Sequence, residues 1–337
     1  MEVTPFGERD RSTVRTMTSS FVDIHAHFVT DQYVAAARAA GITHPDGMPS
    51  WPNFVINDQL GDMDRRGIDR AVLSISSPGV HLVPGRDQEA VALAEHVNST
   101  AARFIKQHPD RLDFLASVPL PDVAAAVREL SRSMDAGAVG ITVESNVHGR
   151  YLGDPEFEPV WEELDRRHGI LFIHPTSPVA WESTAMGLPR PMLEFMFDTT
   201  RTVVDLLRAQ VVHRHPGIRV VVPHAGAALA VLADRVGSFL PLVLGMNPAA
   251  TRWNEQLDTL WFDMAGTPFP RSIPSLVSLA GTSRIVYGSD SCWTPSTGID
   301  AQLASIDAAT APDGSLSWRE LTSVNAARLL AREPHTR

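Results

Sequence analysis

The sequence contains almost no lysine and almost no cysteine, and both shortages limit its chemistry. Among its 337 residues there is one lysine, Lys106, and one cysteine, Cys292. A single cysteine cannot form a disulfide within the chain, so we expect a reducing compartment, the cytoplasm. No adjacent base is identifiable that would activate Cys292 as a nucleophile, and we therefore interpret it as a buried thiol.

Long apolar runs and an excess of positive charge are also missing. No run of about 18 apolar residues occurs, so no membrane-spanning helix is expected. The chain has 29 Lys and Arg residues against 39 Asp and Glu residues, a net charge of -10. Without a basic patch, nucleic acid is not an expected partner. Residues 1–19 lack the apolar core of a secretory signal, and we expect a flexible leader there.

Beyond residue 20, short apolar runs alternate with longer amphipathic segments. Eight runs have the length and composition of buried parallel strands, namely Phe21–Ile24, Ala71–Ile75, Phe114–Val118, Val139–Val143, Ile170–Ile173, Val220–Val222, Thr259–Phe262 and Ile285–Tyr287. Helical patterns lie between or after them, at Gln88–Gln107, Val123–Asp135, Pro155–Arg167, Thr199–Val212, Ala227–Leu240 and Ser317–Leu330. Eight such units predict one (β/α)8 TIM barrel domain over residues 20–337, with an open doubly wound sheet as the alternative.

Histidine and aspartate residues follow several of these strands. Active sites of (β/α)8 barrels lie at the carboxyl ends of the strands, so residues there are expected to converge. Three imidazoles and one carboxylate suit Zn²⁺ or a similar ion and leave room for water or substrate. His224, after the sixth strand, is placed for acid–base work or for hydrogen bonding to an anionic oxygen. The expected metal ligands are His25, His27, His174 and Asp290.

The histidine pairs of the chain differ in their predicted setting. In the strand that begins at Val22, alternate side chains share one side, so His25 and His27 should emerge together. His213 and His215 have the same spacing but follow a helical pattern and precede Pro216. Residues two apart on a helix point away from each other, so we interpret that second pair as a solvated helix end.

Four motifs together resemble the amidohydrolase superfamily and, more narrowly, its decarboxylase branch. They are Asp-Ile-His-Ala-His at 23–27, Ile-His-Pro at 173–175, Pro-His-Ala-Gly-Ala at 223–227 and Tyr-Gly-Ser-Asp at 287–290. The resemblance runs from about residue 20 to residue 332. It implies that His25, His27, His174 and Asp290 hold the metal, and that His224 lies beside it and is catalytic. It also implies a homodimer in which Arg235 reaches the partner's site and binds a substrate carboxylate.

The chain also departs from one part of that branch. The aminocarboxymuconate-semialdehyde decarboxylases use an arginine in the segment after the first strand, but residues 47–52 contain none. A doubly charged muconate is therefore a less expected substrate. Other segments resemble the 6-methylsalicylate decarboxylases, which act on an aromatic acid with an ortho hydroxyl; these are Asp46–Pro49, Leu73–Gly79, His148–Pro155 and His174–Thr176.

We expect one metal ion, with Zn²⁺ as the first choice and Mn²⁺ as the second. Two-metal members of the superfamily often use a carbamylated lysine from the fourth strand, but Lys106 lies in a helical pattern. Glu144 follows the fourth strand and could bridge instead, although we interpret it as an outer or surface acid. A 3-His-1-carboxylate site accepts both ions.

The expected reaction is non-oxidative decarboxylation of a 6-methylsalicylate-like aromatic acid, with release of CO2. Asp290 would deliver a proton to the ring carbon, His224 would hold the phenolic oxygen or relay the proton, and Trp293 would stack on the ring. The alternative is hydrolysis of a lactone or amide by a metal-bound hydroxide on the same ligands. A third interpretation is a non-catalytic metal-binding protein, which predicts that His224→Ala changes nothing.

Overall fold

The computed structural model of the chain describes residues 20–247, 251–310, 312 and 316–331. The leader expected at residues 1–19 lies outside the described residues. Eight parallel strands of the described chain form one sheet in the order β1-β2-β3-β4-β7-β8-β9-β10. Their bounds are β1 Val22–His27, β2 Arg70–Ser74, β3 Leu112–Ser117, β4 Gly140–Glu144, β7 Ile170–His174, β8 Arg219–Val222, β9 Trp261–Asp263 and β10 Ile285–Val286. All eight predicted strands are therefore confirmed.

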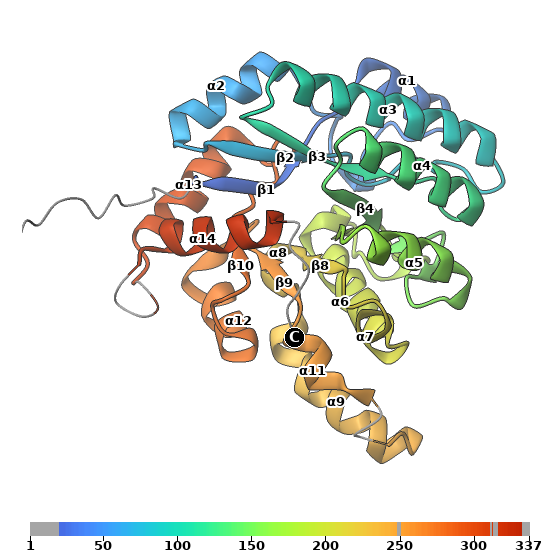
Figure 1. The fold of residues 1–337 in the computed structure, drawn as a ribbon, viewed down its shortest axis with the longest axis vertical. Helices are drawn as coiled ribbons and strands as arrows, with labels where there is room; N and C mark the ends of the chain where they lie inside the picture. The colour runs from blue at the N-terminus through green and yellow to red at the C-terminus, as the bar shows by residue number, and fades with distance from the viewer. Residues whose placement is uncertain (1–19, 248–250, 311, 313–315, 332–337) are drawn as a thin grey trace, which may run out of the picture.

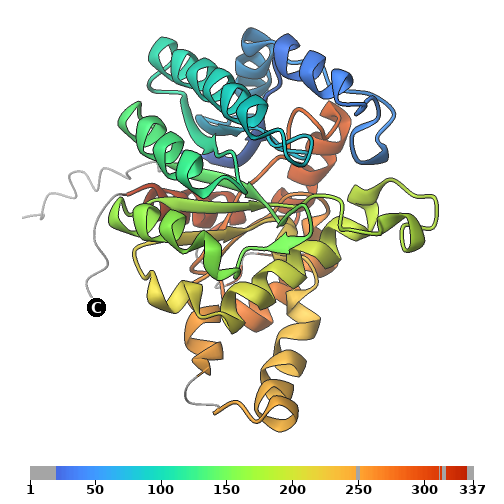
Figure 2. The ribbon, with the colours of Figure 1, turned by 90° about the vertical axis from the view of Figure 1, so that its right-hand side faces the viewer.

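The first and last strands meet and close the sheet into a barrel. Parallel bridges join Asp23 to Tyr287 and Ala26 to Ser291. The Ile24 amide donates to the Tyr287 carbonyl at 2.9 Å, and the Asp290 amide donates to the His25 carbonyl at 2.7 Å. Helices surround the strands in both views (Figures 1 and 2). The predicted (β/α)8 barrel is confirmed, and the open sheet is excluded.

The helices occupy the connections between strands. The α-helices are α1 Asp31–Ala39, α2 Ile56–Arg66, α3 Asp87–Gln107, α4 Val123–Asp135, α5 Glu158–Arg166, α6 Glu194–Arg208, α7 Val211–Arg214, α8 Pro223–Gly226, α9 Leu229–Leu244, α11 Trp253–Leu257, α12 Ile273–Ala280, α13 Ser296–Asp307 and α14 Trp318–Leu330. Short turns are η1 Pro45–Gly47, η2 Pro155–Phe157, η3 Trp181–Ser183, η4 Arg190–Met192 and η5 Pro268–Ser272, and a hairpin joins β5 Asn146–Val147 to β6 Arg150–Tyr151.

The predicted helix over Thr199–Val212 is wrong in its extent. α6 begins at Glu194 and ends at Arg208, and Gln210 has a φ of 57°, which separates it from α7. A non-glycine residue with positive φ cannot continue a right-handed helix. The interpretation of His213 and His215 as a solvated pair is half wrong. His213 is exposed, but His215 is buried and its Nε2 lies 2.9 Å from Glu158 Oε1.

The core has two parts that fix the position of the strand ends. A small apolar cluster draws side chains from seven of the eight strands, which can meet only inside the barrel, and α14 residues Ala326 and Leu329 join it. The larger cluster lies between the strands and the outer helices. Phe172 of the inner cluster contacts the His25 ring, with centroids 4.8 Å apart. The packed interior therefore forms the floor beneath the histidines.

No helix in the described ranges is both long enough and apolar enough to cross a membrane. The helices α9 and α11 form a pair that projects away from the barrel (Figures 1 and 2).

Candidate metal centre and its cavity

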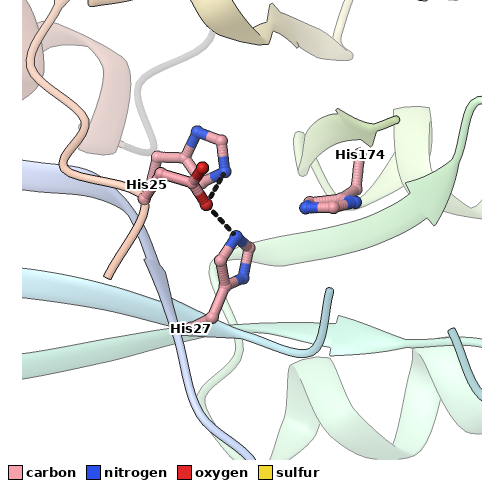
Figure 3. A group of neighbouring side chains, drawn as sticks. His25, His27 and His174 are labelled. Carbon is pink, nitrogen blue, oxygen red and sulfur yellow. Dashed lines mark ion pairs between the residues drawn. The ribbon is translucent and has the colours of Figure 1, made fainter. Parts of the chain in front are cut away.

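The structure brings the four expected ligands together at the carboxyl ends of the strands. His25 and His27 come from β1, His174 ends β7, and Asp290 follows β10. One side-chain ligand atom from each of the four residues lies within 4.8 Å of the others. Figure 3 shows the three imidazoles converging from the two strands. Parallel strands thus gather residues that are far apart in the sequence into one cluster.

Buried nitrogens in this cluster lack hydrogen-bond partners. Nε2 of His25 and Nε2 of His27 are both buried and make no hydrogen bond. Asp290 Oδ1 lies 3.5 Å from the first and 3.2 Å from the second. A buried polar atom without a partner is costly unless a ligand satisfies it. The unpaired nitrogens, beside a carboxylate, fit a divalent cation with nitrogen and oxygen ligands.

The outer nitrogen of each ligand histidine has its own partner. His25 Nδ1 lies 2.7 Å from Asp263 Oδ2, and His174 Nδ1 lies 2.7 Å from the Pro175 carbonyl. His27 Nδ1 lies 3.0 Å from the Ser74 hydroxyl. When Nδ1 donates to such an oxygen, Nε2 keeps its lone pair for a metal. These partners therefore orient all three rings toward the same point.

The protonation of the cluster follows from burial and from its carboxylates. Burial lowers the pKa of His27 and holds the pKa of His174 well below its ordinary value, which favours neutral imidazoles. Burial also opposes protonation of His25, but the nearby Asp263 carboxylate outweighs it and raises the pKa to about 9. Burial would raise the pKa of Asp290, yet the imidazoles of His224, His27 and His25 around the carboxylate hold it well below its ordinary value. Asp290 is thus ionised, as a metal ligand must be.

Two non-glycine residues at the site adopt a left-handed backbone. Asp290 has a φ of 58° and His224 a φ of 54°. The Asp290 amide donates to the His25 carbonyl, and the His224 amide donates to Asp263 Oδ1 at 2.8 Å. Such conformations are uncommon and cluster at functional sites, where the surroundings hold them. His224 Nε2 then lies 3.6 Å from Asp290 Oδ2, on the edge of the cluster.

A cavity of about 350 Å³, which we call the metal cavity, opens above the cluster. His174, His224 and Asp290 line it, together with the apolar side chains of Met48, Met192, Phe195 and Trp293. Trp293 Nε1 donates to Ser76 Oγ at 2.6 Å, which fixes the indole in the wall. Among the described residues that line this cavity there is no lysine or arginine. The cavity can hold a flat aromatic ring beside a metal-bound anion.

Arg235 lies away from this cavity within its own chain. It is exposed on α9, where its guanidinium carbon sits 4.6 Å from the centre of the Phe239 ring. It is not among the residues that line the metal cavity. Any contact between Arg235 and a substrate would therefore come from a second copy of the chain.

Cys292 and Glu144 also lie outside the metal cluster. Burial raises the pKa of the Cys292 thiol to about 12, which leaves it protonated and unreactive. Glu144 ends β4, and its carboxyl lies against Gly79 rather than among the ligand atoms.

Asp263, Asp46 and Phe195 belong to the site but were not predicted as site residues. Asp263 directly ends β9, at the same level as the ligands on other strands, and this position was the signal that could have identified it. Asp46 and Phe195 come from a loop and from α6, and nothing in their sequence context indicates that they line the cavity.

Comparisons with known proteins identify the family of this chain. The amidohydrolase family model matches residues 22–332. The 6-methylsalicylic acid decarboxylase acuB of Aspergillus aculeatus is 32% identical over 306 residues, which cover 87% of this chain and 91% of that protein.

Solved structures share the fold. A crystal structure described as an amidohydrolase II is 33% identical, with a TM-score of 0.84, covering 92% of this chain and 99% of that one. A 5-carboxyvanillate decarboxylase from Novosphingobium aromaticivorans, solved with manganese, is 21% identical with a TM-score of 0.80, covering 93% and 96% of the two chains. The family match spans nearly all of the described residues, and this chain belongs to the amidohydrolase family.

Proposed function

We propose that this chain is a metal-dependent, non-oxidative decarboxylase of an ortho-hydroxy aromatic carboxylic acid such as 6-methylsalicylate. The observation that carries the proposal is a metal-ligand cluster at the floor of a cavity lined by Phe195 and Trp293. The 32% identity to a 6-methylsalicylic acid decarboxylase supports the same substrate class.

One divalent ion fits the site, held by His25, His27, His174 and Asp290. The ligand set suits both Zn²⁺ and Mn²⁺, and we favour Zn²⁺ because three of its four ligands are nitrogens. The manganese in the 5-carboxyvanillate decarboxylase structure supports the second ion. Elemental analysis of the protein purified without added metal distinguishes the two.

When bound, the ion supplies Lewis-acid stabilisation of the substrate's carboxylate and phenolate oxygens. The ionised Asp290 takes the proton of the substrate's phenol and delivers it to the ring carbon that bears the carboxylate. His224 holds the phenolic oxygen or relays that proton, and Trp293 stacks on the ring. The carbon–carbon bond then breaks, its electron pair restores the aromatic ring, and CO2 leaves. Met48, Met192 and Phe195 exclude water, which strengthens these charge interactions.

We also infer a homodimer in which Arg235 contributes to the partner's cavity. α9 exposes apolar side chains, with Val231 75% and Leu242 79% exposed. Large apolar side chains exposed along one helix are typical of an interface. Arg235 lies between these two residues on α9 and does not line its own metal cavity. It would supply the positive charge that the metal cavity lacks among its described residues.

The test is incubation of the metal-loaded protein with 6-methylsalicylate and a panel of hydroxybenzoates, with detection of CO2. We expect CO2 and the matching phenol from the wild-type protein, and none from His224→Ala. Turnover of lactones or amides without any CO2 would show a hydrolase instead. No CO2 release and no hydrolysis by either wild-type protein or His224→Ala, with equal metal content, would show a protein that only binds metal.

A further inference from the structure

A second cavity lies beside the metal cavity at the mouth of the barrel. This side cavity, of about 540 Å³, is lined by Glu144, Ser177, Glu182 and Arg190 among others. Asp46 is the one described residue that lines both cavities. Its side chain therefore belongs to the wall that separates them.

Asp46 is held in place by its surroundings. It lies in the turn η1, is 9% exposed and has a φ of 50° and a ψ of 24°. This left-handed conformation is costly for a residue other than glycine, so the contacts of the side chain must maintain it. Ser177 Oγ donates to Asp46 Oδ1 at 2.5 Å, and Arg190 Nε donates to Ser177 Oγ at 3.0 Å.

The direction of these hydrogen bonds is fixed by chemistry. Arginine can only donate, so the hydroxyl hydrogen of Ser177 remains available for Asp46, whose oxygen accepts it. Burial raises the pKa of Asp46, while the Ser177 and Ser77 hydroxyls and the charge of Arg190 oppose that rise. Burial has the larger effect, so the pKa of Asp46 is raised overall, and the three donors reduce the cost of keeping the buried carboxylate ionised.

Arg190 lies on the side-cavity face of the same wall. It lines the side cavity and not the metal cavity, and its guanidinium carbon sits 3.9 Å from the centre of the Trp181 ring. It also packs against the turn that carries Asp46, because a Cβ on Gly47 would lie 2.5 Å from Arg190 Nη1. The wall therefore presents the Asp46 carboxyl to the metal cavity, whereas Arg190 lies on the side-cavity face of the same wall.

We propose that Asp46 determines substrate specificity by excluding aromatic acids that carry a second carboxylate. The inference rests on the proposed function, in which the metal binds the first carboxylate. A second carboxylate placed near Asp46 would meet a like charge in a cavity with an apolar lining, where repulsion is strong. Arg190 Nε donates to Ser177 Oγ, and Arg190 lines the side cavity rather than the metal cavity, so it does not face a carboxylate bound beside the metal.

The test compares salicylate with a set of salicylates that carry a second carboxylate at different ring positions. In Asp46→Asn we expect the ratio of kcat/KM for at least one dicarboxylate over salicylate to rise about tenfold or more, which corresponds to 1.4 kcal/mol. Adding Arg190→Ala to Asp46→Asn should remove most of that rise. Glu182→Gln, which neutralises an acid that lines only the side cavity, should leave the ratio as in the wild-type protein.

Metal content and thermal unfolding show whether each variant is folded and loaded with metal. If Asp46→Asn does not fold or does not bind metal, Asp46→Ser replaces it in the comparison. A ratio that stays within about twofold of wild type in a folded, loaded variant overturns the proposal. Calorimetric measurement of the binding of the same acids separates the role of Asp46 from the proposed decarboxylase function. If no acid yields CO2, the proposed function fails, while a shift in Kd for the dicarboxylates in Asp46→Asn still supports the role of Asp46.

Discussion

Each imidazole of the metal cluster has two nitrogens, and the partner of the outer nitrogen decides whether the inner one can bind an ion. For His25 that partner is Asp263, which also accepts the backbone amides of His224 and Ala265 at 2.8 and 2.9 Å. One buried carboxylate thus positions both the His25 ring and the backbone of His224, the histidine that we propose is catalytic. Such outer partners affect metal affinity almost as strongly as the ligands.

Asp263→Asn is expected to lower metal affinity by about 10- to 100-fold, because an amide cannot hold the His25 ring with the strength of a carboxylate. Titration of the apoprotein with Zn²⁺ or Mn²⁺ measures this change. Asp258→Asn, which alters an exposed aspartate near the start of the same strand, is the control. Equal affinities in the two variants would mean that Asp263 does not support the site.

The buried carboxyl of Glu144 predicts how the stability of the folded protein depends on pH. Burial raises its pKa from 4.5 to about 8 in the folded protein. The folded state therefore holds the proton more tightly than the unfolded state, and this stabilisation is complete below about pH 4.5 and is lost as the pH rises toward 8. Glu144→Gln should become more stable relative to wild type as pH increases across this window, by on the order of a few kcal/mol.

Chemical unfolding at about pH 5 and about pH 9 measures the difference for Glu144→Gln. The matched control is Glu162→Gln, which changes an exposed glutamate on α5. Parallel stability profiles of wild type and Glu144→Gln would contradict the prediction.

At the scale of strands and helices, the barrel depends on close backbone contacts that only glycine permits. Gly140 opens β4, and a Cβ there would lie 2.1 Å from the Ile170 carbonyl oxygen of β7. Backbone cannot move aside as a flexible side chain can. The register between these strands, which places Glu144 opposite His174, therefore requires glycine at this position.

Gly140→Ala is expected to destabilise the protein by about 1–3 kcal/mol or more, because it overpacks a strand pair. Gly61→Ala is a useful contrast. Gly61 lies in α2, where a Cβ would meet Arg65 Nη1 at an ordinary 3.6 Å, so alanine should add about 0.5–1 kcal/mol of stability. Urea unfolding compares both with wild type, and equal midpoints for the two variants would refute the steric argument.

The strands could be predicted from the sequence because each is a short apolar run, buried on both faces. α4 was also predictable, since Asp122 accepts from the Ala125 amide as an N-cap. Six helices of the described residues, α1, α2, α8, α11, α12 and α13, were not predicted. α12 begins with Ile273 and Pro274 and is largely apolar, so it has no clear polar face to reveal its period.

The metal ligands could be predicted because strand topology carries them to one place. The wall around Asp46 could not, since it depends on how the loop after β1 packs against the loop after β7. Such contacts join segments far apart in sequence and leave no periodic pattern. Arg190, which takes part in this packing, therefore had no recognisable role before the structure.

At the scale of the whole molecule, α9 provides the surface through which we propose that two copies join. α9 and α11 project from the barrel, and α9 exposes Val231, Phe239, Leu242, Val243 and Leu244. Arg235 lies on this same helix, within the interface that we propose. A dimer built through α9 would connect assembly directly to substrate binding.

Mixing two inactive variants tests that connection. If Arg235 acts across the interface, Arg235→Ala and His224→Ala protomers should regain about a quarter of wild-type activity when they exchange subunits, because half of the dimers then carry one complete site. Action within one chain would give no recovery. Val231→Asp is expected to yield monomers in sedimentation, and a mixture that recovers activity without dimers would contradict the proposed interface.

The barrel closes between β1 and β10, and the same seam supplies His25, His27 and Asp290. During synthesis the ribosome releases the first strand long before the last, so a nascent chain holds two ligands without their carboxylate. Complete metal coordination must wait until the final strand has emerged and docked. An ion held by these residues would therefore join the first strand of the barrel to the last, and metal loading would report that the whole barrel has formed.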